Sequence, residues 1–194
     1  SLDGGGIRGI IPATIIQYAE AYLQKKRPGT TIADHFDFIA GTSTGGILTG
    51  IYLAPQKEDN TKAKFSATEA LKFYVDHGYD IFNASKISGL KRFWGLGSAV
   101  KFNPRNLEKL LHEKLGDLKM SELIKPCLIT TYNMAQKSSF FFTSIEDTAK
   151  REFFVHDVLR FVYIPGLGIP KPYCWYIGFI FLVLLSHTRI HPVL

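Results

Sequence analysis

The fold of this chain is decided by the stretch Phe36-Asp37-Phe38-Ile39-Ala40-Gly41-Thr42-Ser43-Thr44-Gly45-Gly46-Ile47-Leu48. The apolar run over 36–40 predicts a strand, and the apolar residues over 46–53 predict a helix. Ser43 therefore lies at the apex of a tight turn. Gly41 and Gly45 flank it two residues away on either side, where a Cβ would clash with neighbouring backbone. A serine in such a turn projects its hydroxyl outward beside the free amides of a helix N-terminus, so Ser43 is a candidate nucleophile.

A second loop, Asp3-Gly4-Gly5-Gly6-Ile7-Arg8-Gly9, lies near the start of the chain. The Gly-x-Ser-x-Gly pattern alone also fits a Ser/Thr/Gly loop that caps a helix. The interpretation of Ser43 as a nucleophile therefore depends on this second loop as well. Helical spacing follows it, through Ile11, Ile15, Tyr18, Ala19 and Tyr22, and Pro28-Gly29 ends the helix. Two successive units of strand, loop and helix predict an α/β fold with a parallel sheet and functional loops at the carboxyl ends of its strands.

The rest of the first 160 residues continues this alternation. Residues 54–66 are predicted to form a surface loop. The expected helices are 67–79, 104–115 and a short one within 148–160 that turns Phe154, Val155, Val158 and Leu159 inward; the expected strands are 127–132 and 140–143.

Composition agrees with one folded domain. The chain has 194 residues, of which 46% are hydrophobic and 21% charged, which suffices for a real core. Cys127 and Cys174 match no metal or disulfide pattern, so a reducing, cytoplasmic setting is expected. The first residues do not have the pattern of a signal peptide, and we expect the chain to be a piece of a longer protein.

Acyl transfer from an ester needs a serine, a base that takes its proton, and donors for the oxyanion. Ser43 supplies the first. The loop over 4–9 offers a run of backbone N–H groups at the sheet edge that carries Ser43, so it is the expected source of the donors. Arg8 is expected to fix this loop or to meet a substrate phosphate.

The same loop also fits the dinucleotide pattern Gly-x-Gly-x-x-Gly. That reading requires a carboxylate at the end of the second strand, and Gly41-Thr42-Ser43 stands there instead. The Gly-Lys-Ser/Thr of a phosphate-binding loop is absent from the chain as well. A nucleotide-binding domain is therefore a weaker alternative.

The two loops, in this order, resemble those of the patatin-like phospholipase family, and the resemblance extends over about residues 1–160. It includes the stretch Tyr74-Val75-Asp76-His77-Gly78-Tyr79-Asp80-Ile81-Phe82. The resemblance implies a three-layer α/β/α sandwich with a mostly parallel sheet, and hydrolysis of phospholipids or galactolipids at a membrane surface, without metal or cofactor and without nucleic acid. It assigns Ser43 as the nucleophile of a Ser-Asp dyad, Gly4, Gly5, Gly6, Arg8 and Gly9 to the oxyanion hole, and Gly41, Thr42, Thr44 and Gly45 to the nucleophile turn.

The chain departs from the family pattern after Arg160. The family's aspartate lies in an Asp-Gly-Gly or Asp-Gly-Ala motif, whereas the only Asp-Gly here is Asp3-Gly4; Asp157 has no glycine after it. Residues 161–194 form an apolar, proline-punctuated tail that reads as unrelated sequence. Since a serine without a base is a poor nucleophile, we expect impaired activity.

Two further questions stay open. The basic, aromatic segment 83–103 is either a solvated connection or a lipid-facing patch. Nucleic-acid binding is a third interpretation, although no nucleic-acid motif accompanies the segment. The whole chain is either a serine acyl hydrolase or a catalytically inactive protein that binds a membrane surface or a partner. The six histidines follow no triad pattern and are expected to be structural or exposed.

Overall fold

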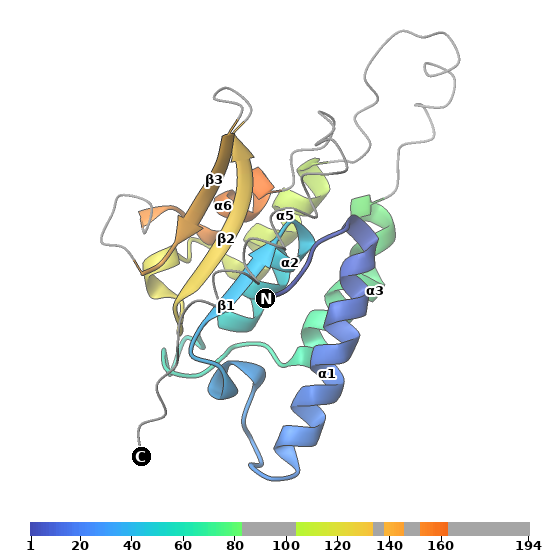
Figure 1. The fold of residues 1–194 in the computed structure, drawn as a ribbon, viewed down its shortest axis with the longest axis vertical. Helices are drawn as coiled ribbons and strands as arrows, with labels where there is room; N and C mark the ends of the chain where they lie inside the picture. Colours follow the sequence, from blue (N-terminus) through green and yellow to red (C-terminus); the bar gives the residue numbers. More distant parts are fainter. Residues whose placement is uncertain (83–103, 134–137, 146–151, 163–194) are drawn as a thin grey trace, which may run out of the picture.

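The computed structural model describes residues 1–82, 104–133, 138–145 and 152–162 (Figure 1). Helices, including short 3-10 turns labelled η, alternate with strands, which agrees with the expected α/β class. The elements are η1 (Gly6–Gly9), α1 (Ile10–Gln24), η2 (Ile32–His35), β1 (Ile39–Thr42), α2 (Thr44–Leu53), α3 (Ala67–Phe82), α5 (Pro104–Leu115), η3 (Met120–Glu122), β2 (Cys127–Asn133), β3 (Ser138–Thr143) and α6 (Val155–Val162). The segment 83–103 and the tail after residue 162 lie outside the described residues.

The sheet is mixed. Its three strands are ordered β1-β2-β3, with β1 parallel to β2 and β3 antiparallel to β2. Leu2 forms a parallel bridge with Gly41 on the other side of β1, where Leu2 N donates to Ala40 O at 2.8 Å and Thr42 N donates to Leu2 O at 3.1 Å. The segment that leads into the glycine loop therefore lies beside the strand that leads into Ser43.

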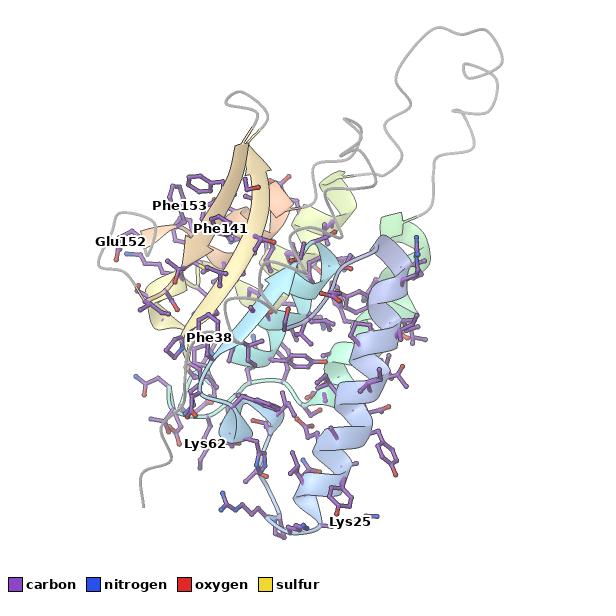
Figure 2. The ribbon with its side chains drawn as sticks, viewed as in Figure 1. Lys25, Phe38, Lys62, Phe141, Glu152 and Phe153 are labelled. Carbon is purple, nitrogen blue, oxygen red and sulfur yellow. The ribbon has the colours of Figure 1, made fainter. Side chains whose placement is uncertain are left out.

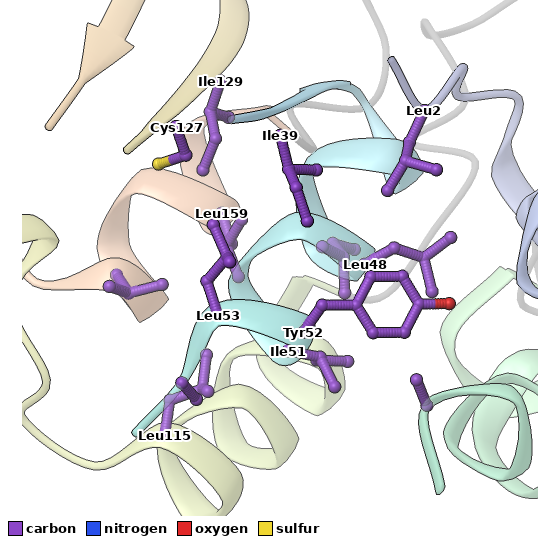
Figure 3. Close-up of a cluster of buried hydrophobic side chains, with 14 of the residues drawn as sticks. Leu2, Ile39, Leu48, Ile51, Tyr52, Leu53, Leu115, Cys127, Ile129 and Leu159 are labelled. Atoms are coloured by element: carbon purple, nitrogen blue, oxygen red, sulfur yellow. The ribbon is translucent and has the colours of Figure 1, made fainter. Parts of the chain in front are cut away.

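The helix α2 is the centre of the core. All of its residues are buried, because its sequence carries no charge and the sheet and α6 pack against it. Figure 1 shows α2, α5 and α6 behind the sheet, whereas α1 and α3 pair at its side. Leu48 and Ile51 of α2 and Leu159 of α6 belong to one buried cluster (Figure 3). A Cβ at Gly50 would come within 2.9 Å of Leu159 Cδ1, so the glycine permits close packing of α6.

The carboxylate of Glu20 is buried between three segments. Its two oxygens accept hydrogen bonds from the backbone amides of Ile32, at 2.7 Å, and Ala67, at 2.8 Å. A buried charge is tolerated only when donors surround it, and here it satisfies the first amides of η2 and α3. Glu20 thus fixes α1 against both elements.

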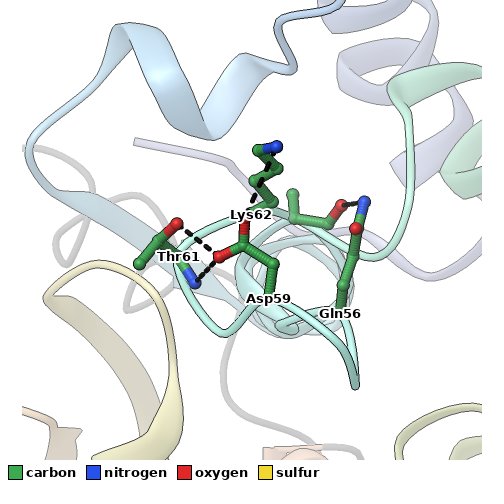
Figure 4. Close-up of polar contacts among 5 residues, drawn as sticks. Gln56, Asp59, Thr61 and Lys62 are labelled. Carbon is green, nitrogen blue, oxygen red and sulfur yellow. Dashed lines mark hydrogen bonds and ion pairs between the residues drawn. The ribbon is translucent and has the colours of Figure 1, made fainter.

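The surface loop predicted over 54–66 is present and ordered by its own polar side chains (Figure 4). Asp59 accepts hydrogen bonds from the amide of Thr61 at 3.0 Å and from its hydroxyl at 2.6 Å, and pairs with Lys62. These hydrogen bonds hold the pKa of Asp59 below its usual value. Gln56 Nε2 donates to Ala63 O at 3.0 Å, which closes the loop.

Two details of the sequence prediction need correction. The strand begins at Ile39 rather than Phe36, because Ile39 is the first residue with a partner in β2, whose first residue is Cys127. The side chains of Phe36 and Phe38 are consequently exposed, and Phe38 is labelled in Figure 2. Phe154 is also exposed, at 36%, since it lies just before α6 and not on its inner face.

The helix predicted by the spacing after the glycine loop is confirmed as α1. Four of the residues that define this spacing, Ile11, Ile15, Tyr18 and Tyr22, are exposed. Its buried positions are Ala13 and Glu20, which lie on the side packed against α3.

None of the helices in the described ranges combines the length and apolar character that crossing a bilayer requires.

Candidate active site

Ser43 occupies the junction between β1 and α2 with an unusual backbone. Its φ is 54° and its ψ is −126°, and among the described residues it is the only one other than glycine with a positive φ. Such a conformation costs about 1–3 kcal/mol and persists only where the surroundings enforce it. The strand, the sharp turn and the helix have the strand-turn-helix arrangement that the sequence predicted around Ser43.

Gly41 and Gly45 allow this turn because backbone passes directly over both. A Cβ on Gly41 would overlap the carbonyl of Gly45, and a Cβ on Gly45 would come within 2.6 Å of the carbonyl carbon of Leu2. The spacing of the two glycines around Ser43 therefore has the steric cause that the sequence suggested.

The glycine loop lies against Ser43. A Cβ on Gly4 would overlap Ser43 Cβ and the carbonyl oxygen of Thr42, and would stand 3.1 Å from Ser43 Oγ. Gly5 and Gly6, with φ of 150° and 63°, adopt conformations that side chains disfavour. The two segments singled out from the sequence thus meet at one sheet edge.

Thr44 joins these two segments. Its Oγ1 accepts a hydrogen bond from the amide of Gly5 at 3.2 Å, while its carbonyl oxygen accepts one from the Tyr74 hydroxyl at 2.6 Å. A Cβ on Gly9 would lie 2.8 Å from Tyr74 Cε1 and 2.9 Å from Thr44 Oγ1. Sequence reasoning missed this arrangement, because the contacts join residues far apart in the chain; its only signal was a tyrosine among the apolar positions of the α3 region.

A model of the family described as "Patatin-like phospholipase" matches residues 1–163. The chain belongs to this family. Patatin-like protein 2 of Oryza sativa subsp. indica is 42% identical over 152 residues, which are 75% of this chain and 36% of that protein. Patatin-like protein 2 of Arabidopsis thaliana is 38% identical over 149 residues, 75% of this chain and 36% of that protein. Patatin-1-Kuras 2 of Solanum tuberosum is 37% identical over 145 residues, 74% of this chain and 36% of that protein.

The chain therefore spans just over a third of the length of these patatin relatives. The description of the family as phospholipases names lipids as its substrate class. The match agrees with the resemblance of the two loops. Family membership does not determine whether this chain is active, which depends on its own residues.

Within the described ranges, neither a carboxylate nor an imidazole is hydrogen-bonded to Ser43. Asp157, the acid considered from the sequence, lies in the first turn of α6, with one carboxylate oxygen 3.7 Å from His156 Nε2. Arg8 is exposed in η1 beside Gly5. The same part of the chain contains no group of three or more His, Cys, Asp or Glu side chains able to hold a metal ion.

A surface pocket lies between α5 and α6, lined by Glu108, Lys109, His112, Glu113 and His156. The rings of His112 and His156 meet edge to face at 5.1 Å, and His156 Nδ1 lies 2.9 Å from the carbonyl oxygen of Gly116. None of the lining residues belongs to the glycine loop or the Ser43 turn. This histidine pair packs α6 against the end of α5, a structural role of the kind expected from the sequence.

Proposed function

We propose that this chain carries the nucleophile and oxyanion loop of a serine acyl hydrolase that acts on phospholipids or galactolipids. The observation that supports it best is the contact of Gly4 with Ser43, whose backbone is held in a strained turn. This juxtaposition leaves an ester carbonyl within reach of both a hydroxyl and a run of backbone amides.

In the proposed reaction, Ser43 Oγ adds to the ester carbonyl carbon while a base takes its proton. The carbonyl oxygen becomes an oxyanion, for which the loop Gly4, Gly5, Gly6, Arg8 and Gly9 offers amide donors. The Gly5 amide donates to Thr44 Oγ1 and the Arg8 amide donates to Gly5 O at 3.3 Å, so we assign these two amides chiefly to holding the loop. The bond to the lipid alcohol then breaks, the alcohol leaves with a proton, and water releases the fatty acid from the acyl-serine.

The general base is the part of the proposed site for which this chain offers no matching residue. Family resemblance assigns it to an aspartate followed by glycine, and this sequence offers no such residue besides Asp3 in the glycine loop. We therefore propose that hydrolysis by this chain is slow. We also propose that residues 1–160 correspond to an incomplete patatin domain of three layers with a mostly parallel sheet, followed by a divergent apolar tail over 161–194. The protein would work in the cytoplasm at a membrane surface.

A fluorophosphonate probe tests the nucleophile directly, because it reacts with an activated serine and reports it as a mass increase on one peptide. Because no base is matched to Ser43, we expect slow labelling on the peptide with Ser43 and loss of this labelling in Ser43→Ala. Ser121→Ala, which changes a serine of η3 instead, is the matched control and should label normally. Labelling that survives in Ser43→Ala contradicts the proposal.

The second candidate function is a catalytically inactive protein that binds a membrane or a partner. It is favoured by the absence, in the described ranges, of an acid or imidazole bonded to Ser43. A folded chain that does not label at Ser43 and does not hydrolyse a short-chain ester supports this second function.

A further inference from the structure

One side of α1 presents a continuous apolar surface to solvent. It consists of Ile7, Ile11, Ile15, Tyr18 and Tyr22, which we call the α1 stripe, and these side chains are between 46% and 78% exposed. Their spacing of three and four residues aligns them on one face of the helix. Isolated exposed apolar side chains are ordinary, but a row over four turns marks an interaction surface.

The stripe points away from the rest of the described protein. On a helix of 3.6 residues per turn, it lies opposite Ala13 and Glu20, which are 0% and 4% exposed and pack toward α3. The exposed acids of α3, Glu69 and Asp76, belong to the helix on the far side of α1 from the stripe.

The exposed charged residues of α1 and of the three residues after it have one sign. Glu20 is the only acidic residue of α1, and it is buried and hydrogen-bonded to two amides. Lys25, three residues after Tyr22, continues the stripe at the end of the helix (Figure 2), and Lys26 and Arg27 follow it, all exposed. Lys26 Nζ lies 5.4 Å from the centre of the Tyr22 ring. Apolar and tyrosine side chains flanked by cations and free of acids suit the headgroup region of an anionic bilayer.

We propose that the α1 stripe docks the chain on an anionic phospholipid membrane. This deepens the proposed function and rests on it for its purpose, since Ile7, the first residue of the stripe, lies in η1 within the glycine loop that contacts Ser43. A membrane seated along α1 would therefore reach the end of the helix at which an ester would react. A second copy of the chain is a poorer occupant, because two such surfaces would bring together cations without acids.

Cosedimentation with vesicles tests the proposal without any hydrolysis. The full chain is mixed with vesicles of phosphatidylcholine alone or of phosphatidylcholine with phosphatidylglycerol. We expect preferential binding to the anionic vesicles that weakens at high salt. The double variant Ile15→Ser/Tyr18→Ser should bind at least about tenfold more weakly, because two apolar side chains are lost from the buried surface. Lys25→Glu should lower binding to the anionic vesicles only.

Two controls keep the result interpretable. Val75→Ser removes an apolar side chain that is 61% exposed on α3 and should bind like the unchanged chain. Tyr18→Trp retains an interfacial aromatic ring and should bind at least as well. Circular dichroism and thermal unfolding identify any variant that fails to fold, and Lys25→Glu, at an exposed helix end, supplies the answer if the double variant unfolds.

Unchanged binding of the folded stripe variants overturns the proposal. So does sedimentation equilibrium that finds a stable dimer without vesicles, lost in the same variants, since the stripe would then be covered by a second copy. If Ser43 proves unreactive while the stripe variants lose vesicle binding, the docking surface stands and the hydrolase function fails.

Discussion

The amide nitrogen of Gly5 lies 3.2 Å from the side-chain oxygen of Thr44, and this hydrogen bond joins the glycine loop to the residue that follows Ser43. The two residues are 39 positions apart in sequence. The carbonyl oxygen of Thr44 also accepts a hydrogen bond from the Tyr74 hydroxyl, so a side chain from α3 supports the turn. The relative position of serine and loop thus depends on Thr44.

Replacing Thr44 by valine removes this acceptor while preserving the shape of the side chain. We expect a loss of about 1–2 kcal/mol in the free energy of unfolding and about ten- to a hundredfold slower labelling of Ser43, because the loop amides lose their register with the serine. Thr44→Ser keeps the acceptor and should recover most of both. Denaturant unfolding and labelling kinetics measure the two effects, and a valine variant that labels at the original rate would show that Thr44 does not position the loop.

Adding one methyl group to Gly45 should be far more damaging than adding it to Gly29. A Cβ on Gly45 would strike the backbone of Leu2 and Asp3, so Gly45→Ala should lower the free energy of unfolding by more than about 3 kcal/mol. Gly29 has open space around it and a φ of 80°, so its alanine variant pays only the conformational term of about 1–2 kcal/mol. Urea denaturation of the pair checks this order, and equal losses would contradict the close approach of the two segments.

The two buried tyrosines should respond in opposite directions to loss of their hydroxyls. Tyr74→Phe removes the bond to Thr44 O and should cost about 1–1.5 kcal/mol of unfolding free energy. The Tyr52 hydroxyl is buried without a hydrogen-bond partner among the described residues, so Tyr52→Phe should be neutral or stabilise by about 1 kcal/mol. Thermal unfolding of both variants distinguishes them, and a clear loss in Tyr52→Phe would mean that its hydroxyl is satisfied.

The thiol of Cys127 predicts a pH dependence. Its complete burial raises its pKa from 9.0 to about 11. Because the pKa is higher in the folded than in the unfolded chain, this stabilisation is complete below about pH 9 and is lost as the pH rises toward 11. The difference in unfolding free energy between the parent and Cys127→Ala should therefore shrink over this range by about 2–3 kcal/mol. Burial raises the pKa of Tyr52 and Tyr74 as well, but both proteins share these groups, so parallel pH curves would contradict the prediction.

Local patterns in the sequence predicted much of this fold. The helix expected over 104–115 has these bounds, and Gly116 follows it with a φ of 59°, a conformation that suits glycine at a helix end. The turn around Ser43 was also foreseeable from the local spacing of Gly41 and Gly45, and the constraint on Gly41 is the nearby carbonyl of Gly45. The constraint on Gly45 comes instead from the backbone of Leu2 and Asp3, which are distant in sequence.

Long-range packing decides the features that the sequence left undetermined. The residues of α1 are apolar on both sides, so periodicity predicted the helix but not the side that packs against α3. That choice follows from Glu20, whose partners Ile32 and Ala67 lie outside the helix. The start of β1 depends on where β2 begins. The hydrogen bonds from Gly5 to Thr44 and from Tyr74 to Thr44 join three elements, so no single stretch of sequence predicts them.

The carboxylate of Glu20 also has a kinetic consequence. Since one side chain holds the first amides of two different elements, α1 cannot swing away without releasing the start of η2 and the start of α3 in the same event. The amides of Ile32 and Ala67 should therefore exchange their hydrogens with deuterium at a common opening rate. The N-terminal helical layer then opens as one cooperative unit instead of fraying helix by helix.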